Sequence, residues 1–134
     1  MVAPEVEAVV GAYPPAARRR FEELRRLVYQ VAEREGAGPL TETLKWGEPA
    51  YLTAASKAGT TVRLAWKAKE PAVIGAYVNC NTTLVETWRR MFDGTLAFAG
   101  NRAVLLDLAG PLPDRPLAIC LAQALTYHRD KRRS

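Results

Sequence analysis

One short segment without helical periodicity, residues 41–51, holds the residue types that a small binding site uses. Gly47 can adopt a positive φ angle, while Pro49 fixes its own φ at about −65° and lacks an amide donor. We therefore expect a rigid corner between two short extended segments. One cation and two aromatic rings lie at this corner: Lys45, Trp46 and Tyr51. Such a corner suits a ligand pocket, although a purely structural turn could have the same composition.

Two further cations, Arg63 and Arg102, lie in or beside predicted strands. If those strands are neighbours, Lys45, Arg63 and Arg102 could hold an anionic group while Trp46 and Tyr51 form the walls of the site. The sequence therefore predicts a non-enzymatic binding module for a small anionic ligand. The alternative is a simple solvated face, because the exposed face of an antiparallel sheet is normally polar.

The common templates for catalysis, for metal binding and for phosphate binding are missing from the sequence. His128 is the single histidine, and it lies near the end of a predicted helix, which disfavours a Ser-His or Cys-His pair. Zinc-ligand spacings and glycine-rich phosphate loops are also absent. Cys80 and Cys120 are interpreted as buried structural thiols. We therefore expect neither an enzyme nor a resident cofactor.

Composition indicates one globular domain, because 49% of the 134 residues are apolar and 25% are charged. We expect a single domain over 1–134, with a core over 13–128 and a basic tail over 129–134. The formal net charge of +5 arises from this tail and from an arginine-rich helix whose glutamates alternate with the arginines, which argues against a nucleic-acid partner. No apolar run approaches the roughly 20 residues of a membrane span, and no signal peptide is evident, so we expect a cytoplasmic protein without a membrane partner.

Hydrophobic periodicity predicts the elements that position these residues. Apolar residues at helical spacing predict a long helix over 15–35 and a final helix over 114–129. Thr83 and Glu86 fit a capping box at the start of a short inserted helix. Alternating or apolar runs predict strands over four segments beyond the corner: 60–67, 72–79, 95–99 and 103–108. The predicted fold is α+β, an antiparallel sheet of about five strands with the N- and C-terminal helices on one face.

The order of these motifs resembles the YdhG-like family, domain-of-unknown-function family 1801. The resemblance spans residues 13–128 and is carried chiefly by Trp46-Gly-Glu-Pro-Ala-Tyr51, by Asn79-Cys80-Asn81 and by Gly100-Asn-Arg-Ala103. It implies a frataxin-like fold, in which two terminal helices pack on an antiparallel sheet. This agrees with the element order predicted from periodicity.

The resemblance also implies an alternative function, since some relatives have been treated as iron chaperones by their likeness to frataxin. The acidic candidates for an iron site are Glu22, Glu23 and Glu42. Frataxins bind iron along an acidic ridge on the first helix, whereas this helix is net basic, and hard cations prefer clustered oxygen ligands. A third alternative is a protein-interaction scaffold that uses the exposed sheet or the basic tail.

Overall fold

A sheet layer and a helix layer make up the fold in the computed structural model, which describes residues 2–133. Over these residues the strands form one sheet in the order β1-β2-β3-β4-β6-β5, with every neighbouring pair antiparallel. The six strands are β1 (Thr41–Lys45), β2 (Glu48–Leu52), β3 (Val62–Trp66), β4 (Val73–Tyr77), β5 (Ala97–Ala99) and β6 (Ala103–Asp107). The predicted α+β class is confirmed. The sheet has six strands where about five were predicted, and the two extended segments expected on either side of the 41–51 corner are the strands β1 and β2.

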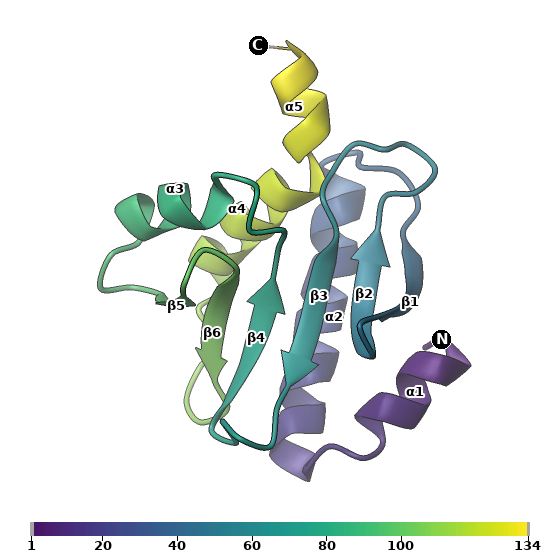
Figure 1. The fold of residues 1–134 in the computed structure, drawn as a ribbon, viewed down its shortest axis with the longest axis vertical. Helices are drawn as coiled ribbons and strands as arrows, with labels where there is room; N and C mark the ends of the chain where they lie inside the picture. Colours follow the sequence, from purple (N-terminus) through teal and green to yellow (C-terminus); the bar gives the residue numbers. More distant parts are fainter. Residues whose placement is uncertain (1, 134) are drawn as a thin grey trace.

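The five helices of residues 2–133 are α1 (Pro4–Val10), α2 (Pro15–Arg34), α3 (Leu84–Met91), α4 (Asp114–Leu125) and α5 (Tyr127–Arg133). In Figure 1, α2 and α4 lie behind the sheet and α5 projects from its upper end. The final helix predicted over 114–129 is therefore divided, because Thr126 leaves helical geometry with φ −124° and ψ 12°. None of these helices combines the length and the apolar character that a membrane crossing needs.

The hydrophobic core lies between α2, α4 and the sheet. Phe21, Leu24 and Val28 follow the helical 3–4 spacing along α2, and each is at most 1% exposed. Val62 and Leu64 of β3 meet this layer from the sheet and are fully buried. Two valines of α1 are also buried in the cluster, so the core extends on the N-terminal side of the limits 13–128 expected from the sequence.

The other side of the sheet, which we call the open face, is left uncovered by the helices of residues 2–133 (Figure 1). Side chains alternate along a strand, so Arg63 and Ala65 project to the open face while Val62 and Leu64 project to the core. Tyr77 of β4 is the register partner of Arg63 and therefore shares this face. The alternation predicted for the 60–67 segment is confirmed.

The inserted helix α3 begins at the predicted position without the predicted cap. Thr83 is the N-cap residue, but its side chain makes no capping hydrogen bond. Its φ of −92° and ψ of 11° differ from the extended geometry that a capping side chain requires. The helix is held instead by Trp88, which is 2% exposed and donates its indole N–H to Gln123 Oε1 of α4 at 2.8 Å.

Candidate functional site

The five residues predicted to bind an anion do not share one pocket. Tyr51 is fully buried on the helix-covered face, where its register partner is Val62. Arg63 is the register partner of the preceding residue, Ala50, and so projects to the open face. The sheet itself therefore separates Tyr51 from Arg63, and the two side chains cannot contact the same small ligand.

Lys45 and Arg63 do lie on a common face, around one carboxylate. Glu48 is the register partner of Lys45 on β1 and accepts a hydrogen bond from Arg63 Nη1 on β3. Lys67 Nζ lies 3.6 Å from the second oxygen of Glu48. The cations of Arg63 and Lys67 also stand over the Tyr77 ring, 5.2 Å and 4.7 Å from its centre. This cluster is ordered, but the nearest cavity has a volume of only about 10 Å³.

Trp46 and Arg102 occupy two separate turns. Trp46 and Gly47 form the two-residue turn between β1 and β2, with φ values of 58° and 75°, as expected for a type I′ turn. The predicted corner at 41–51 is therefore a β-hairpin, and its Trp46 side chain is 90% exposed. Arg102 is exposed in the turn between β5 and β6, at the opposite edge of the sheet from β1.

A much larger cavity lies on the outer side of α2. This groove, which we call the α2 groove, has a volume of about 930 Å³ and runs between α2, the loop at 36–40 and the N-terminal segment. Tyr29 and Arg26 of α2 stand at its centre, with Glu22 toward one end and Glu33 toward the other. The remaining walls are largely apolar, formed by Val2, Ala32, Pro39 and Leu40.

A buried carboxylate fixes the inner wall of the α2 groove. The side chain of Glu42 on β1 is 6% exposed and accepts hydrogen bonds from Arg25 Nε at 2.6 Å, from Tyr51 Oη at 2.8 Å and from the Ala3 amide at 2.7 Å. Burial alone would raise the pKa of Glu42, but these donors outweigh it and hold the pKa below its usual value. Burial, followed by the bond to Glu42, raises the pKa of Tyr51.

The same network orients Tyr29 in the groove. The Arg25 guanidinium lies over the Tyr29 ring, 4.8 Å from its centre, and Tyr51 meets that ring edge to face at 5.9 Å. Contacts of this kind hold an aromatic ring in one orientation. Tyr29 is therefore positioned before any ligand arrives.

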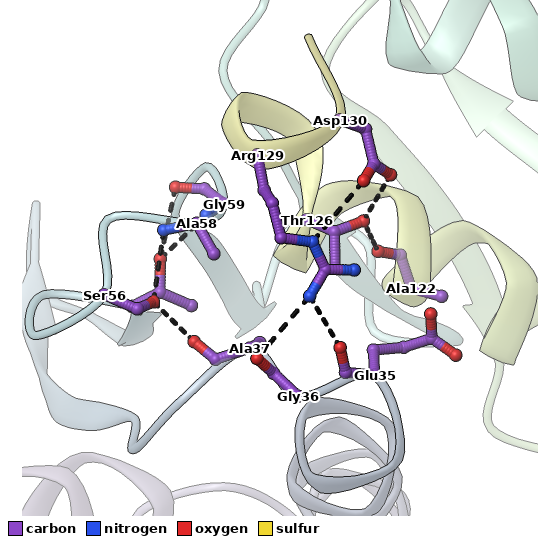
Figure 2. Close-up of polar contacts among 11 residues, drawn as sticks. Glu35, Gly36, Ala37, Ser56, Ala58, Gly59, Ala122, Thr126, Arg129 and Asp130 are labelled. Atoms are coloured by element: carbon purple, nitrogen blue, oxygen red, sulfur yellow. Dashed lines mark hydrogen bonds and ion pairs between the residues drawn. The ribbon is translucent and has the colours of Figure 1, made fainter. Parts of the chain in front are cut away.

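The C-terminal helix α5 supports the end of the groove that lies near Gly36. Figure 2 shows the Arg129 guanidinium directed at the end of α2, where Nη1 donates to Glu35 O at 2.7 Å and to Gly36 O at 3.5 Å. Ser56, in the loop between β2 and β3, donates to Ala37 O. Residue 129, predicted as the first residue of the basic tail, thus anchors α5 to the body of the domain.

The three acidic residues considered for iron are not brought together. Glu42 is bound to Arg25, Glu23 is paired with Arg20 at 3.2 Å, and Glu22 lies in the α2 groove. Within residues 2–133, no group of three His, Cys, Asp or Glu side chains is arranged to hold a metal ion.

The α2 groove was not predicted from the sequence, although one signal for it is present. Glu22, Arg26, Tyr29 and Glu33 follow helical spacing on the polar side of α2, and this side was considered from the sequence only for its charge. An aromatic residue within such a face is the unusual feature. The breaker cluster Gly36-Ala-Gly38-Pro39 marks the end wall, but its position relative to α2 depends on the tertiary fold.

Comparison with known proteins gives no relative from which a function could be taken. No family model, no curated protein and no solved structure matches this chain. The resemblance to the YdhG-like family therefore stays a prediction from the sequence.

Proposed function

We propose that this protein is a non-enzymatic binding module for a small organic anion, and that the α2 groove is its binding site. The observation that supports this most directly is the groove itself, whose volume of about 930 Å³ lies in the range of roughly 300–1,000 Å³ typical of ligand pockets. The ligand class is the one expected from the sequence. The site differs from the five residues predicted for it.

Arg26 is the residue of the groove best suited to bind the anionic group. It is exposed, lies one turn from Tyr29 on the same helix, and lines the groove. A guanidinium can bind a carboxylate or phosphate through two parallel hydrogen bonds. Arg25 is already bound to Glu42, so its main role is to hold the wall and Tyr29. The apolar body of the ligand would pack against Tyr29 and Leu40.

The two glutamates narrow the ligand class further. Glu22 and Glu33 lie on either side of the central Arg26, toward the two ends of the groove. Carboxylates accept hydrogen bonds and repel a second anion. We therefore expect a ligand with one anionic group and with hydroxyl or amino groups at its periphery, such as an aromatic hydroxy acid or an amino acid.

The state of Glu42 supports binding instead of proton transfer. A general base works best with a pKa near the operating pH, whereas three donors keep the pKa of Glu42 low. Its oxygens are occupied by Arg25, Tyr51 and the Ala3 amide. Glu42 therefore acts as a structural anchor for the wall of the groove.

A thermal-shift screen with matched variants tests this proposal. The panel contains aromatic and aliphatic hydroxy acids, amino acids, sugar phosphates and, under anaerobic conditions, ferrous iron. A ligand that binds only the native state at one hundred times its Kd adds about 2.7 kcal/mol to the free energy of unfolding. We expect an organic anion to stabilise the protein, and Arg26→Ala to remove most of this shift.

Arg19→Ala is the matched control, because Arg19 is an exposed arginine of the same helix and is not among the residues that line the groove. It should leave the ligand-induced shift unchanged. Equal losses in the two variants would mean that the protein binds anions only through its net charge. Stabilisation by ferrous iron alone would favour the iron-binding alternative.

A further inference from the structure

The backbone conformation of the turn that carries Trp46 lowers the stability of the fold. In a type I′ turn both central residues have positive φ, so Asn-Gly is the favoured pair. Trp46 adopts φ 58°, a region that costs a residue with a side chain about 1–2 kcal/mol. Trp46 is 90% exposed, so packing of its ring against the fold compensates little of this loss in stability. The strained turn therefore holds a large aromatic side chain in solvent, which is typical of a functional position.

An excess of positive charge surrounds this turn on the open face. Lys45 precedes Trp46 and is exposed, while Arg63 and Lys67 both contact Glu48. Arg63 and Lys67 thus share one carboxylate, and Lys45 lies opposite it in the register. These three cations and Glu48 together carry a charge of about +2 on this part of the open face. Glu48 holds Arg63 and Lys67 in place, so the positive groups are ordered in advance.

A small apolar cluster of Ala65, Tyr77 and Ala103 occupies the middle of the open face. Ala65 and Ala103 are at most 3% exposed although no helix covers them, because the Tyr77 ring lies over its own strand. A Cβ added at Gly75 would approach Cε1 of Tyr77 to within 2.4 Å. With a cavity of only about 10 Å³ here, this surface suits a macromolecule better than a small molecule.

We propose that Trp46, with Lys45, Arg63 and Lys67, forms a docking surface for an acidic protein segment, one that offers an apolar pocket for the indole and carboxylates around it. Tryptophan and arginine are the residue types most enriched among the dominant contacts of protein interfaces. The carboxylates of the partner would meet Lys45 and the two cations held by Glu48. This surface lies on the opposite side of the sheet from the α2 groove and does not depend on it.

Two other classes of macromolecule fit the surface less well. Single-stranded nucleic acid stacks its bases on successive exposed rings, but Tyr77 is 7% exposed and faces Arg63 and Lys67. A membrane surface requires several apolar side chains together. Among residues 2–133 the other large exposed hydrophobic side chains are Met91 and Ile119, which lie on α3 and α4, away from Trp46.

A selection from a displayed library of random 15-residue peptides on the immobilised full-length protein tests the proposal. We expect the enriched peptides to combine aspartate or glutamate with large apolar residues. Their affinity, measured by fluorescence anisotropy, should fall as salt rises. Trp46→Asn should weaken binding by at least about 30-fold, the factor equivalent to the loss of a dominant interface contact. This variant retains a favoured turn and should melt at the same or a higher temperature.

The charged part of the surface is tested by a matched pair of charge reversals. Lys45→Glu should weaken binding of the selected peptides by about tenfold, while Arg115→Glu, an equal change at an exposed position on α4, should have little effect. Arg26→Ala in the α2 groove should leave peptide binding unchanged. These variants therefore distinguish a failure of the proposed ligand site in the α2 groove from a failure of the proposed docking surface.

Several results would overturn the proposal. These are the absence of any enriched peptide, enrichment of neutral or basic peptides, and equal binding by the Trp46→Asn protein. Oligouridylate and vesicles of phosphatidylglycerol are examined with the same variants. Binding of either that depends on Trp46 and exceeds peptide binding would assign the surface to nucleic acid or to a membrane instead.

Discussion

At the scale of single residues, Glu42 connects the most parts of the molecule. Its two oxygens join α2 through Arg25, β2 through Tyr51 and the N-terminal segment through the Ala3 amide. A buried carboxylate with several charge-assisted or amide donors is stabilised in its ionised form. Removing it takes the Glu42 carboxylate away from Arg25, whose side chain is 20% exposed and lies in a partly buried site.

We predict that Glu42→Gln lowers the free energy of unfolding at pH 7 by about 3 kcal/mol, because it removes one partner of a largely buried ion pair. The pKa of Glu42 is lower in the folded state than in the unfolded chain, so its contribution is full above the unfolded value of about 4.3. It is lost as the pH falls through the folded pKa. Urea unfolding of both proteins between pH 7 and pH 3 should show the difference shrink in acid.

Glu86→Gln is the control for this prediction. Glu86 is 66% exposed and pairs with Arg90 at 3.4 Å on the surface of α3, so its replacement should change the free energy of unfolding by less than about 0.5 kcal/mol at either pH. A pH-independent loss in Glu42→Gln would show that packing, and not the ionised carboxylate, stabilises this wall.

The sequence did not show which side of the sheet Tyr51 occupies, for a physical reason. In β2 the residues Pro49, Ala50 and Tyr51 are all buried. This strand therefore has no alternation of buried and exposed residues that would indicate which face of the sheet Tyr51 occupies. A shift of one residue in register would reverse the face of every side chain. The loop that connects β2 and β3 contacts the end of α4, so we expect the register between these two strands to depend on tertiary contacts as well as on the local sequence.

At the scale of elements, that loop is positioned by a close approach of two backbones. Gly59 lies so near the end of α4 that a Cβ at this position would be 2.3 Å from backbone atoms of Leu125. The Thr60 amide donates to Ala124 O at 2.9 Å beside it. Only glycine allows this approach, and the approach in turn brings Arg129 into reach of the end of α2.

We predict that Gly59→Ala lowers the free energy of unfolding by about 3 kcal/mol, since backbone atoms must move apart to admit the methyl group. Gly75→Ala is the matched comparison. There the obstructing atom belongs to the Tyr77 ring, which can rotate away, so a smaller loss of about 1 kcal/mol is expected. Urea unfolding measures both losses. Equal losses in Gly59→Ala and Gly75→Ala would mean that the backbone at Gly59 shifts as easily as the Tyr77 side chain does.

Arg129 gives a second prediction at this scale. Its guanidinium is charged and binds two carbonyls at the C-terminal end of α2, where a cation is favourable. The side chain is 25% exposed, so we predict a loss of about 1.5 kcal/mol for Arg129→Ala. Amide hydrogen exchange over 35–38 should also accelerate. Arg132→Ala, at an exposed position of α5, should leave both quantities unchanged.

Most elements were predictable because their signals are local. The helical spacing of α2 and the alternation of β3 each depend on a few adjacent residues, and the structure confirms both. The break between α4 and α5 was not predicted. It occurs at Thr126, whose hydroxyl lies 2.7 Å from Ala122 O and 2.9 Å from Asp130 Oδ2 and donates its one proton to either acceptor. Such a local side-chain hydrogen bond competes with the helix. The anchoring of the basic tail was not predicted either, because Arg129 binds the carbonyls of Glu35 and Gly36, which follow α2 and are far away in sequence.

At the scale of the whole molecule, the two chain ends described by the structure both help to build the α2 groove. Val2 lines it directly, and the neighbouring Ala3 amide is held by Glu42. At the other end of the groove, Arg129 holds the carbonyls of Glu35 and Gly36. The groove could not be predicted from the sequence because its walls meet only when both ends of the chain have folded onto α2.

The two walls should nevertheless be energetically independent. Arg25, which binds Glu42, and Glu35, which binds Arg129, are ten residues apart on α2 or its cap, about 15 Å along the helix axis. Sites that are this far apart and share no partner show additive effects within about 0.5 kcal/mol. We predict that the Glu42→Gln and Arg129→Ala double variant loses the sum of the two single losses, about 4.5 kcal/mol, in urea unfolding. A loss in the double variant that is smaller than this sum by more than about 1 kcal/mol would show that disrupting one wall already disrupts the other. The chain ends and α2 would then form one cooperative unit.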